Sequence, residues 1–433
     1  MEHLEFTLQQ HTPMLHFQAS QERATLRASD VKPRFDRWLI KKVWKDNFDE
    51  CCSYLVGYSD KFSEEQRDNF RQKFDDGYRA LNYKMRIVPS GKQTVERIVR
   101  ERTTRDGRVR LDSVTPMYFG YDDKKPEDLN LKAVSYDEVR LTLVFTGTVA
   151  SDLRDNISTY IGLFFMTHNF GTRATKGYGS FTVKNDCPEP TRLKYTFEGN
   201  SWHELMEDID VFYKTMRGGI NWPHKNIYFK SLMFAYAKSK GKRWDKKTIK
   251  ENLLNTTEIN RQKNDHDDPD ILIYREGADD MYDFRDALGL STDEKWDYYG
   301  VKISKNNDSI PRFASPILFK PVRTDGVWTI YIVWTELPQN IYDKTIPVRV
   351  MVDNQEKAAE KVQGRYGKTY EDLVTLKIPR DLTITDYMDF LFKRNPAGSY
   401  SVDPEEYYVK GDAATKNRIM SIYKAIRENF NRP

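Results

Sequence analysis

The sequence predicts an α+β fold, in which helices pack against antiparallel sheets. Two observations in the first half of the 433-residue chain support this prediction. Short segments with alternating apolar and polar residues have the period of half-buried strands, and longer segments with apolar residues three and four apart have the period of amphipathic helices. These segments follow the order strand, helix, strands, helix, strand, so residues 1–199 are expected to form one layered domain.

The first strand and helix have the clearest patterns. In residues 4–10 apolar and polar side chains alternate, as in a half-buried edge strand. Residues 29–45 carry apolar side chains at helical spacing, and Ser29 is the predicted N-cap. A second helix, charged on most faces, is expected at 64–80.

The sequence patterns of the other predicted elements in this domain are weaker. A basic stretch at 91–110 has the glycine and charged residues of a long hairpin or mobile loop. The remaining segments are strands at 82–88, 113–119, 138–146, 180–184 and 192–197, and a helix at 149–168.

The second half of the chain is expected to contain a partly helical domain at 200–337 and a C-terminal extension of unknown role at 338–433. Residues 256–285 are polar and charged and are predicted to form an exposed loop. A T-D-G turn predicts a hairpin between two of the strands. The predicted elements are helices at 202–216, 226–239 and 413–429, and strands at 314–321, 327–334, 346–352 and 372–377.

Composition argues against several classes of protein. The three cysteines are not in a C-x-x-C spacing, so neither a zinc site nor a disulfide framework is expected. The acidic segment 264–270 lacks the glycine spacing of a calcium loop, so no metal or other cofactor is predicted. We find no secretory signal and no run of 18 apolar residues, so a cytoplasmic protein without a membrane span is expected. The net charge of +4 is small, so only the distribution of charge can indicate a partner.

The first segment that indicates function is basic. Residues 12–18 read T-P-M-L-H-F-Q, and between Arg23 and Lys45 there are eight Lys and Arg against two Asp. Arg27 and Lys32 flank the predicted helix start, where positive charge opposes the helix dipole. An anion docked at that helix start would explain them, whereas the alternative is a solvated basic face.

The second segment, residues 169–181, reads N-F-G-T-R-A-T-K-G-Y-G-S-F. Its glycines permit tight turns and close approach to a phosphodiester, its two cations supply charge, and its tyrosine offers a stacking surface. It lacks Gly-Lys-Ser/Thr and follows a predicted helix, so it is not a nucleotide-binding loop; a plain structural turn is the alternative. The candidate residues are Gly171, Arg173, Lys176, Gly177, Tyr178 and Gly179.

These residues resemble the glycine-rich signature of the RAMP superfamily, the RNA-binding proteins of CRISPR systems. The N-terminal segment resembles the opening of the first subunit of the type III-B Cmr effector complex, although Pro33 stands where that family has a small residue. Residues 312–320 resemble the start of a late RAMP strand, and residues 338–433 match nothing we can place. The matching N-terminal residues are Thr12, Pro13, Arg27, Ala28, Ser29, Lys32 and Arg37.

The resemblance implies tandem ferredoxin-like folds with helical insertions and a C-terminal extension. It also implies a non-catalytic RNA-binding subunit that contacts guide RNA near its 3′ end, target RNA, or both, in antiviral defence. Other Cmr-type subunits would be its protein partners, and no membrane or small-molecule substrate is expected. The implied RNA-binding residues are those of the glycine-rich segment together with Arg27, Lys32, Arg34, Arg37 and Lys41.

Other interpretations stay open at this point. A metal-independent endoribonuclease that matures guide RNA would use His11 or His16 as general base, although a structural role is favoured for both. A protein-binding adaptor would use residues 338–433 as its docking surface. The basic stretches at 84–110 and 238–250 fit either phosphate contacts or plain solvated surface.

Overall fold

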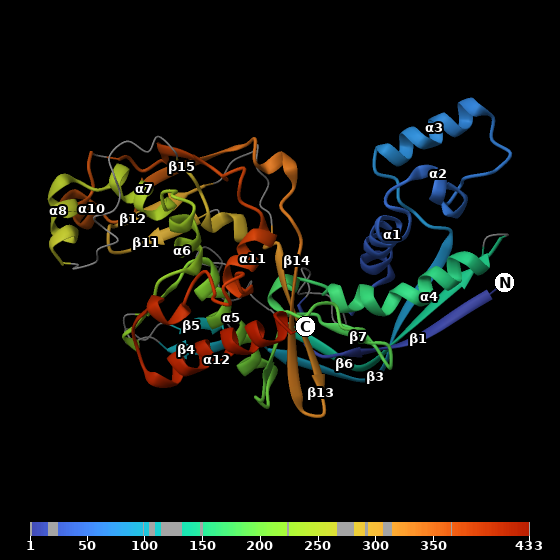
Figure 1. The fold of residues 1–433 in the computed structure, drawn as a ribbon. Coiled ribbons are helices and arrows are strands. Elements are labelled where there is room, and N and C mark those ends of the chain that lie inside the picture. Colours follow the sequence, from blue (N-terminus) through green and yellow to red (C-terminus); the bar gives the residue numbers. More distant parts are fainter. Residues whose placement is uncertain are drawn as a thin grey trace. The chain divides into compact units, whose positions relative to one another are not determined.

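The structure is a computed structural model. Its helices and antiparallel sheets make the chain an α+β protein, as predicted (Figure 1). His16, residues 114–119 of one predicted strand and residues 266–270 of the acidic segment lie outside the described residues. The described residues are 2–15, 25–97, 99–103, 109–113, 132–147, 150–222, 225–265, 281–290, 293–305, 314–364 and 366–432.

The chain forms two compact units. Unit 1 consists of residues 1–210 and 318–333, and unit 2 of residues 211–317 and 334–433. The division differs from the three domains expected from sequence, because residues 318–333 join the N-terminal unit. The C-terminal residues belong to the same unit as residues 211–317.

The main sheet of unit 1 has β6 at its centre. One edge of β6 pairs with β3 and the other with β1 and β2, while β7 pairs with the far side of β1; all pairings are antiparallel. The predicted edge strand is confirmed for the first part of β1, since residues 2–6 pair with β6 alone among the described strands, whereas β7 covers the other side of β1 at residues 8–10. The strands are β1 (Glu2–Gln10), β2 (Met14–Leu15), β3 (Tyr83–Arg97), β6 (Lys132–Phe145) and β7 (Phe181–Val183).

Helices α1 (Ala28–Trp44) and α4 (Ala150–Thr167) pack on one face of this sheet (Figure 1). The apolar stripes of the two helices meet, and the rings of Phe35 and Phe164 lie 4.9 Å apart in the core. The N-cap prediction was wrong: α1 begins at Ala28, and Arg27 is the N-cap residue in extended conformation. Pro33 lies inside the helix without ending it.

A small helical subdomain follows α1 and contains α2 (Phe48–Cys51) and α3 (Glu64–Asp75). Its centre is aromatic, with the rings of Phe48 and Phe74 5.5 Å apart. The helix predicted at 64–80 ends at Asp75, and Ser63 begins it with a capping box.

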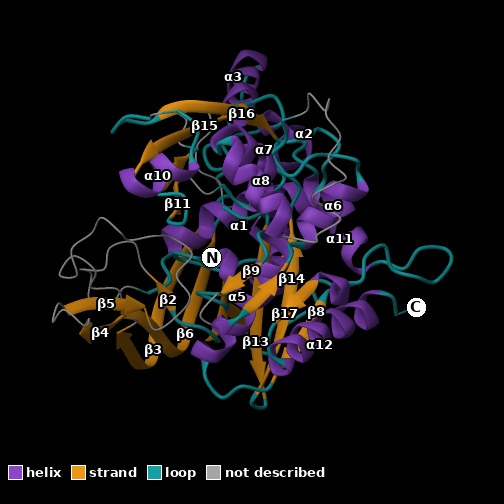
Figure 2. Cartoon of the chain, turned by 90° about the vertical axis from the view of Figure 1, so that its left-hand side faces the viewer, coloured by secondary structure: helices purple, strands orange, loops and turns teal. Residues whose placement is uncertain are grey.

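The rest of unit 1 consists of two smaller sheets. Residues 91–110 were predicted to form a long hairpin or a mobile loop. They overlap the antiparallel pair of β4 (Val99–Thr103) and β5 (Val109–Ser113). The other sheet has the order β13-β14-β8 (Figure 2), and the predicted T-D-G turn is present with positive φ at Asp325 and Gly326. Its strands are β8 (Lys194–Phe197), β13 (Ile317–Thr324) and β14 (Val327–Trp334).

Unit 2 contains a four-stranded sheet, β11-β12-β15-β16, and a three-stranded sheet, β17-β10-β9. Its first helix, α5 (Trp202–Arg217), begins in unit 1. The helix predicted at 226–239 starts only at Leu232, because residues 227–229 form a strand. The elements are β9 (Ile220–Trp222), β10 (Ile227–Phe229), α6 (Leu232–Ser239), α7 (Asp245–Leu253), α8 (Thr256–Asp265), β11 (Asp293–Trp296), β12 (Val301–Ser304), β15 (Thr345–Val352), α10 (Gln355–Lys361), β16 (Glu371–Lys377), α11 (Ile384–Phe392), β17 (Tyr408–Lys410) and α12 (Ala413–Phe430).

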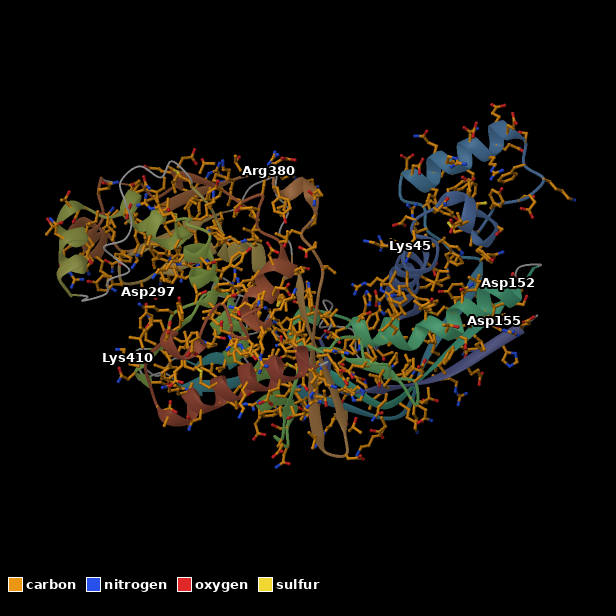
Figure 3. The ribbon with its side chains drawn as sticks, viewed as in Figure 1. Lys45, Asp152, Asp155, Asp297, Arg380 and Lys410 are labelled. Carbon is orange, nitrogen blue, oxygen red and sulfur yellow. The ribbon has the colours of Figure 1, made fainter. Side chains whose placement is uncertain are left out.

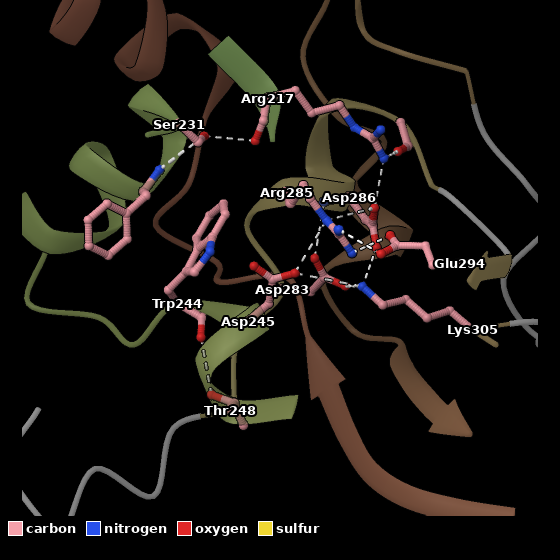
Figure 4. A network of polar contacts seen from close by, with 12 residues as sticks. Arg217, Ser231, Trp244, Asp245, Thr248, Asp283, Arg285, Asp286, Glu294 and Lys305 are labelled. Carbon is pink, nitrogen blue, oxygen red and sulfur yellow. Dashed lines mark hydrogen bonds and ion pairs between the residues drawn. The ribbon is translucent and has the colours of Figure 1, made fainter. Parts of the chain in front are cut away.

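A buried ion network lies in unit 2 (Figure 4). Lys305 Nζ lies 2.6 Å from Asp283 and also contacts Asp286, and Arg285 Nη2 lies 2.6 Å from Glu294. Burial raises the pKa of Asp283 to about 8, whereas the neighbouring cations hold the pKa of Asp286 below its usual range. The prediction of an exposed loop at 256–285 was therefore wrong at its ends, which form α8 and part of this network.

Candidate nucleic-acid interface

The two segments that indicated function lie side by side in unit 1. Thr12 Oγ1 donates to the carbonyl of Gly177 at 2.6 Å and accepts from the amide of Ser180 at 3.0 Å. The Gly179 amide donates to the Pro13 carbonyl at 2.9 Å, in line with the isolated bridge between Leu15 and Thr172. Residues 12–15, which we call the Thr-Pro segment, are thus hydrogen-bonded to the glycine-rich segment.

The glycines of this segment allow close contact within the protein. A Cβ on Gly171 would lie 2.5 Å from the Leu15 carbonyl oxygen, and one on Gly179 would collide with the Phe170 backbone. Both residues also have positive φ, which L side chains rarely adopt. A Cβ on Gly177 would lie 3.1 Å from Pro321. Packing therefore explains these glycines, and their contact with RNA stays a prediction.

Three other predicted site residues are buried. Arg173, Lys176 and Tyr178 are 7%, 8% and 1% exposed. The Tyr178 ring packs edge-on against Trp202, with the ring centroids 6.0 Å apart. A base cannot stack on a ring that is covered in this way. The accessible part of the segment is Gly171 to Thr175, except for Arg173.

Helix α1 presents the accessible positive charge. Arg34, Arg37 and Lys41 are exposed at positions i, i+3 and i+7, so they follow one face of the helix; we call them the basic ridge. The Arg34 guanidinium lies 5.9 Å from the Phe170 ring, which connects the ridge to the glycine-rich segment. Arg27 is exposed at the helix start, and Lys45 projects from its end (Figure 3).

Lys32 has partners within the domain. Its Nζ donates to Asp36 Oδ2 at 2.5 Å and to the Leu81 carbonyl at 2.9 Å, and it lies 4.2 Å from the Tyr83 ring centroid. Asp36 is buried, which raises its pKa, while the Lys32 charge opposes that rise. Since Lys32 balances a buried carboxylate, we expect it to contribute less than the ridge to binding of phosphate.

An aromatic flank beside the ridge was missed from sequence. Trp38 is half-buried on α1, with its ring centroid 6.4 Å from Tyr160 and 6.3 Å from His168. Helical spacing assigned Trp38 to the core. Its position between basic residues was the available signal, because aromatic rings beside cations form stacking surfaces for single strands.

Both ring nitrogens of His11 form hydrogen bonds. Nδ1 accepts from the Arg323 amide at 3.1 Å, so the ring proton is on Nε2 and is donated to Thr182 Oγ1 at 2.8 Å. Burial and the nearby Lys320 lower its pKa to about 3. A general base needs a free lone pair, so this arrangement disfavours catalysis by His11.

The described part of the chain contains no group of three or more His, Cys, Asp or Glu side chains that could hold a metal ion. The helices within it are too short or too polar to cross a membrane.

The glycine-rich segment and residues 12–15, which carry the RAMP resemblance, are hydrogen-bonded to each other in an α+β domain. Family comparison agrees: the Cmr1 N-terminal domain matches residues 1–220, and the Cmr1 C-terminal domain matches residues 228–403. The chain therefore belongs to the Cmr1 family, RAMP subunits of the type III-B CRISPR (Cmr) complex. A search of curated proteins found no match. Residues 338–403, which matched nothing in the motif comparison, lie within the C-terminal family domain.

Proposed function

We propose that this chain is a non-catalytic RNA-binding subunit of a Cmr ribonucleoprotein, which holds guide RNA near its 3′ end, target RNA, or both, in cytoplasmic antiviral defence. One observation carries the proposal: α1 exposes Arg34, Arg37 and Lys41 in one line beside the half-buried Trp38. The family supports assembly with other Cmr subunits.

The proposal includes a ferredoxin-like unit 1. The strand order β3-β6-β1-β7 and the succession β1, α1, β3, β6, α4, β7 support it. A ferredoxin-like fold for unit 2 rests on the resemblance alone. In this arrangement α1 and α4 lie on one face of the sheet, and the basic ridge is the accessible side of the first helix.

The ridge suits a phosphodiester backbone. Arg34 and Lys41 are seven residues apart, which is about 10 Å along a helix axis. Cations spaced in this way would bind phosphates and position a strand without reading its sequence, while a base could rest against the exposed part of Trp38. Binding should accordingly depend on salt and vary little with sequence.

The ribonuclease alternative has less support. His11 is occupied on both nitrogens, and His16 lies outside the described residues. A ribonuclease would produce discrete fragments in the presence of EDTA, whereas a scaffold leaves RNA intact.

The test is binding of labelled single-stranded RNA to the purified chain at several salt concentrations. The triple variant Arg34→Ala, Arg37→Ala, Lys41→Ala should bind at least about tenfold more weakly, with a salt slope smaller by up to about 2. The matched control changes Arg380, Lys393 and Lys424, three exposed cations of unit 2, to Ala and should bind like the wild type.

The same samples are then run on a denaturing gel. Equal loss of affinity in both triple variants would show that net charge matters and the ridge does not. RNA cleavage by the wild type in EDTA would favour the ribonuclease.

A further inference from the structure

Three consecutive residues of β13 contact the base of the glycine-rich segment. The Phe319 carbonyl accepts from Asn169 Nδ2 at 2.8 Å, and the Pro321 carbonyl accepts from Ser180 Oγ at 2.6 Å. Between them, Lys320 Nζ donates to the carbonyls of His168 at 3.0 Å and Phe181 at 2.6 Å. These two carbonyls flank residues 169–180, so one amine joins both ends of the segment.

The surroundings of Lys320 are unusual for a lysine. The residue is 0% exposed, and its hydrogen-bond partners in the described part of the chain are carbonyl oxygens. Burying an amine is costly, and an apolar side chain would suit a buried strand position better. The two carbonyl bonds are therefore the physical reason for a lysine at this position.

Each of the two carbonyls lies where the chain changes direction. His168 directly follows α4, where the last carbonyls of a helix lack partners within the helix and accept hydrogen bonds from other donors. Phe181 is the first residue of β7. The amine thus connects the end of a helix to the start of a strand, and the glycine-rich segment lies between them.

We propose that Lys320 is a positioning residue for RNA binding: it closes the base of segment 169–180 so that the accessible part of the segment is held beside Arg34. This inference rests on the proposed RNA-binding function. Lys320 is fully buried, so it does not touch RNA itself, and its effect on binding must pass through the segment.

This indirect role has a distinct signature. Removal of a residue that contacts phosphate reduces the salt dependence of binding, because fewer counterions are then released when RNA binds. Loss of a buried positioning residue should lower affinity and leave the salt slope unchanged. The ridge variants should change both.

The experiment compares the full-length wild type with Lys320→Met, which keeps length and removes the donor. Hydrogen exchange measured by mass spectrometry should be about tenfold faster in residues 169–180, with β1 and β6 unchanged. Affinity for labelled single-stranded RNA should fall about three- to tenfold at an unchanged salt slope. Ser180→Ala removes one bond at the same base and should give a smaller effect of the same kind if Lys320→Met does not fold.

Unchanged exchange in 169–180, or a uniform rise across unit 1, would overturn the positioning role. Faster exchange in the segment with full RNA affinity would overturn its link to RNA. If the wild type binds no RNA, the proposed function fails, and the exchange comparison by itself decides whether Lys320 holds the segment.

Discussion

Lys32 and Lys41 lie on the same helix, but their ammonium groups have different surroundings. Lys32 contacts buried Asp36 and a backbone carbonyl, whereas Lys41 is exposed and has no ion pair among the described residues. Removing the cation that pairs with a buried carboxylate leaves a buried charge without compensation and destabilises the fold. Removing an exposed cation leaves no such buried charge and changes stability little.

We therefore expect Lys32→Met to lower the free energy of unfolding by about 3 kcal/mol. Lys41→Met should change it by less than about 0.5 kcal/mol but weaken RNA binding. Urea unfolding and RNA titration of the two variants check this. Equal stability of both variants would contradict the assignment of Lys32 to the core.

The two half-buried histidines predict a pH dependence. The pKa is lowered to about 3 for His11 and about 4 for His168, mainly by burial. As pH falls below about 6.5, the unfolded chain binds these protons first, so the free energy of unfolding decreases until the lowered values are reached.

Each histidine should contribute at most about 1.4 kcal/mol per pH unit to this decrease. Urea unfolding at pH 7, 6 and 5 measures it, and His11→Gln should show a shallower decrease than the wild type. Parallel curves for the two proteins would mean that His11 is not protected from protonation in the folded state.

At the scale of elements, the glycine-rich segment depends on close backbone packing. Gly179 and Gly326 both have positive φ, but a Cβ on Gly179 would collide with Phe170, and one on Gly326 would meet nothing within 4 Å. The pair therefore separates backbone strain from steric collision.

Gly326→Ala should cost about 1 kcal/mol through left-handed strain. Gly179→Ala should cost about 3 kcal/mol or more, because the Phe170 backbone must also move. Thermal unfolding of the two variants compares them. A similar loss in both would show that the segment can adjust and that close approach is not required.

Local patterns predicted many elements and could not predict distant packing. The spacing in residues 29–45 is sufficient for α1, and T-D-G is sufficient for the hairpin turn. Nothing near residue 320 indicates that its amine reaches carbonyls at 168 and 181. The burial of Tyr178 likewise depends on Trp202, so its predicted role as a stacking surface could not be judged from the motif.

At the scale of the whole molecule, the two units bury ionisable side chains differently. Unit 2 contains the network of Lys305, Arg285 and several carboxylates, and its members Asp283 and Arg285 lie in the segment predicted as an exposed loop. Unit 1 buries Lys320 on carbonyls and carries the basic ridge at its surface. Net charge conceals this distribution, since 69 cations and 65 anions nearly cancel.

Ultraviolet cross-linking of labelled single-stranded RNA to the full chain, followed by mapping of the linked peptides, tests the central claim most directly. We predict a nucleotide linked to the α1 peptide that contains Trp38, and loss of that link in the ridge triple variant. Cross-links confined to unit 2, with none on α1, would contradict the account.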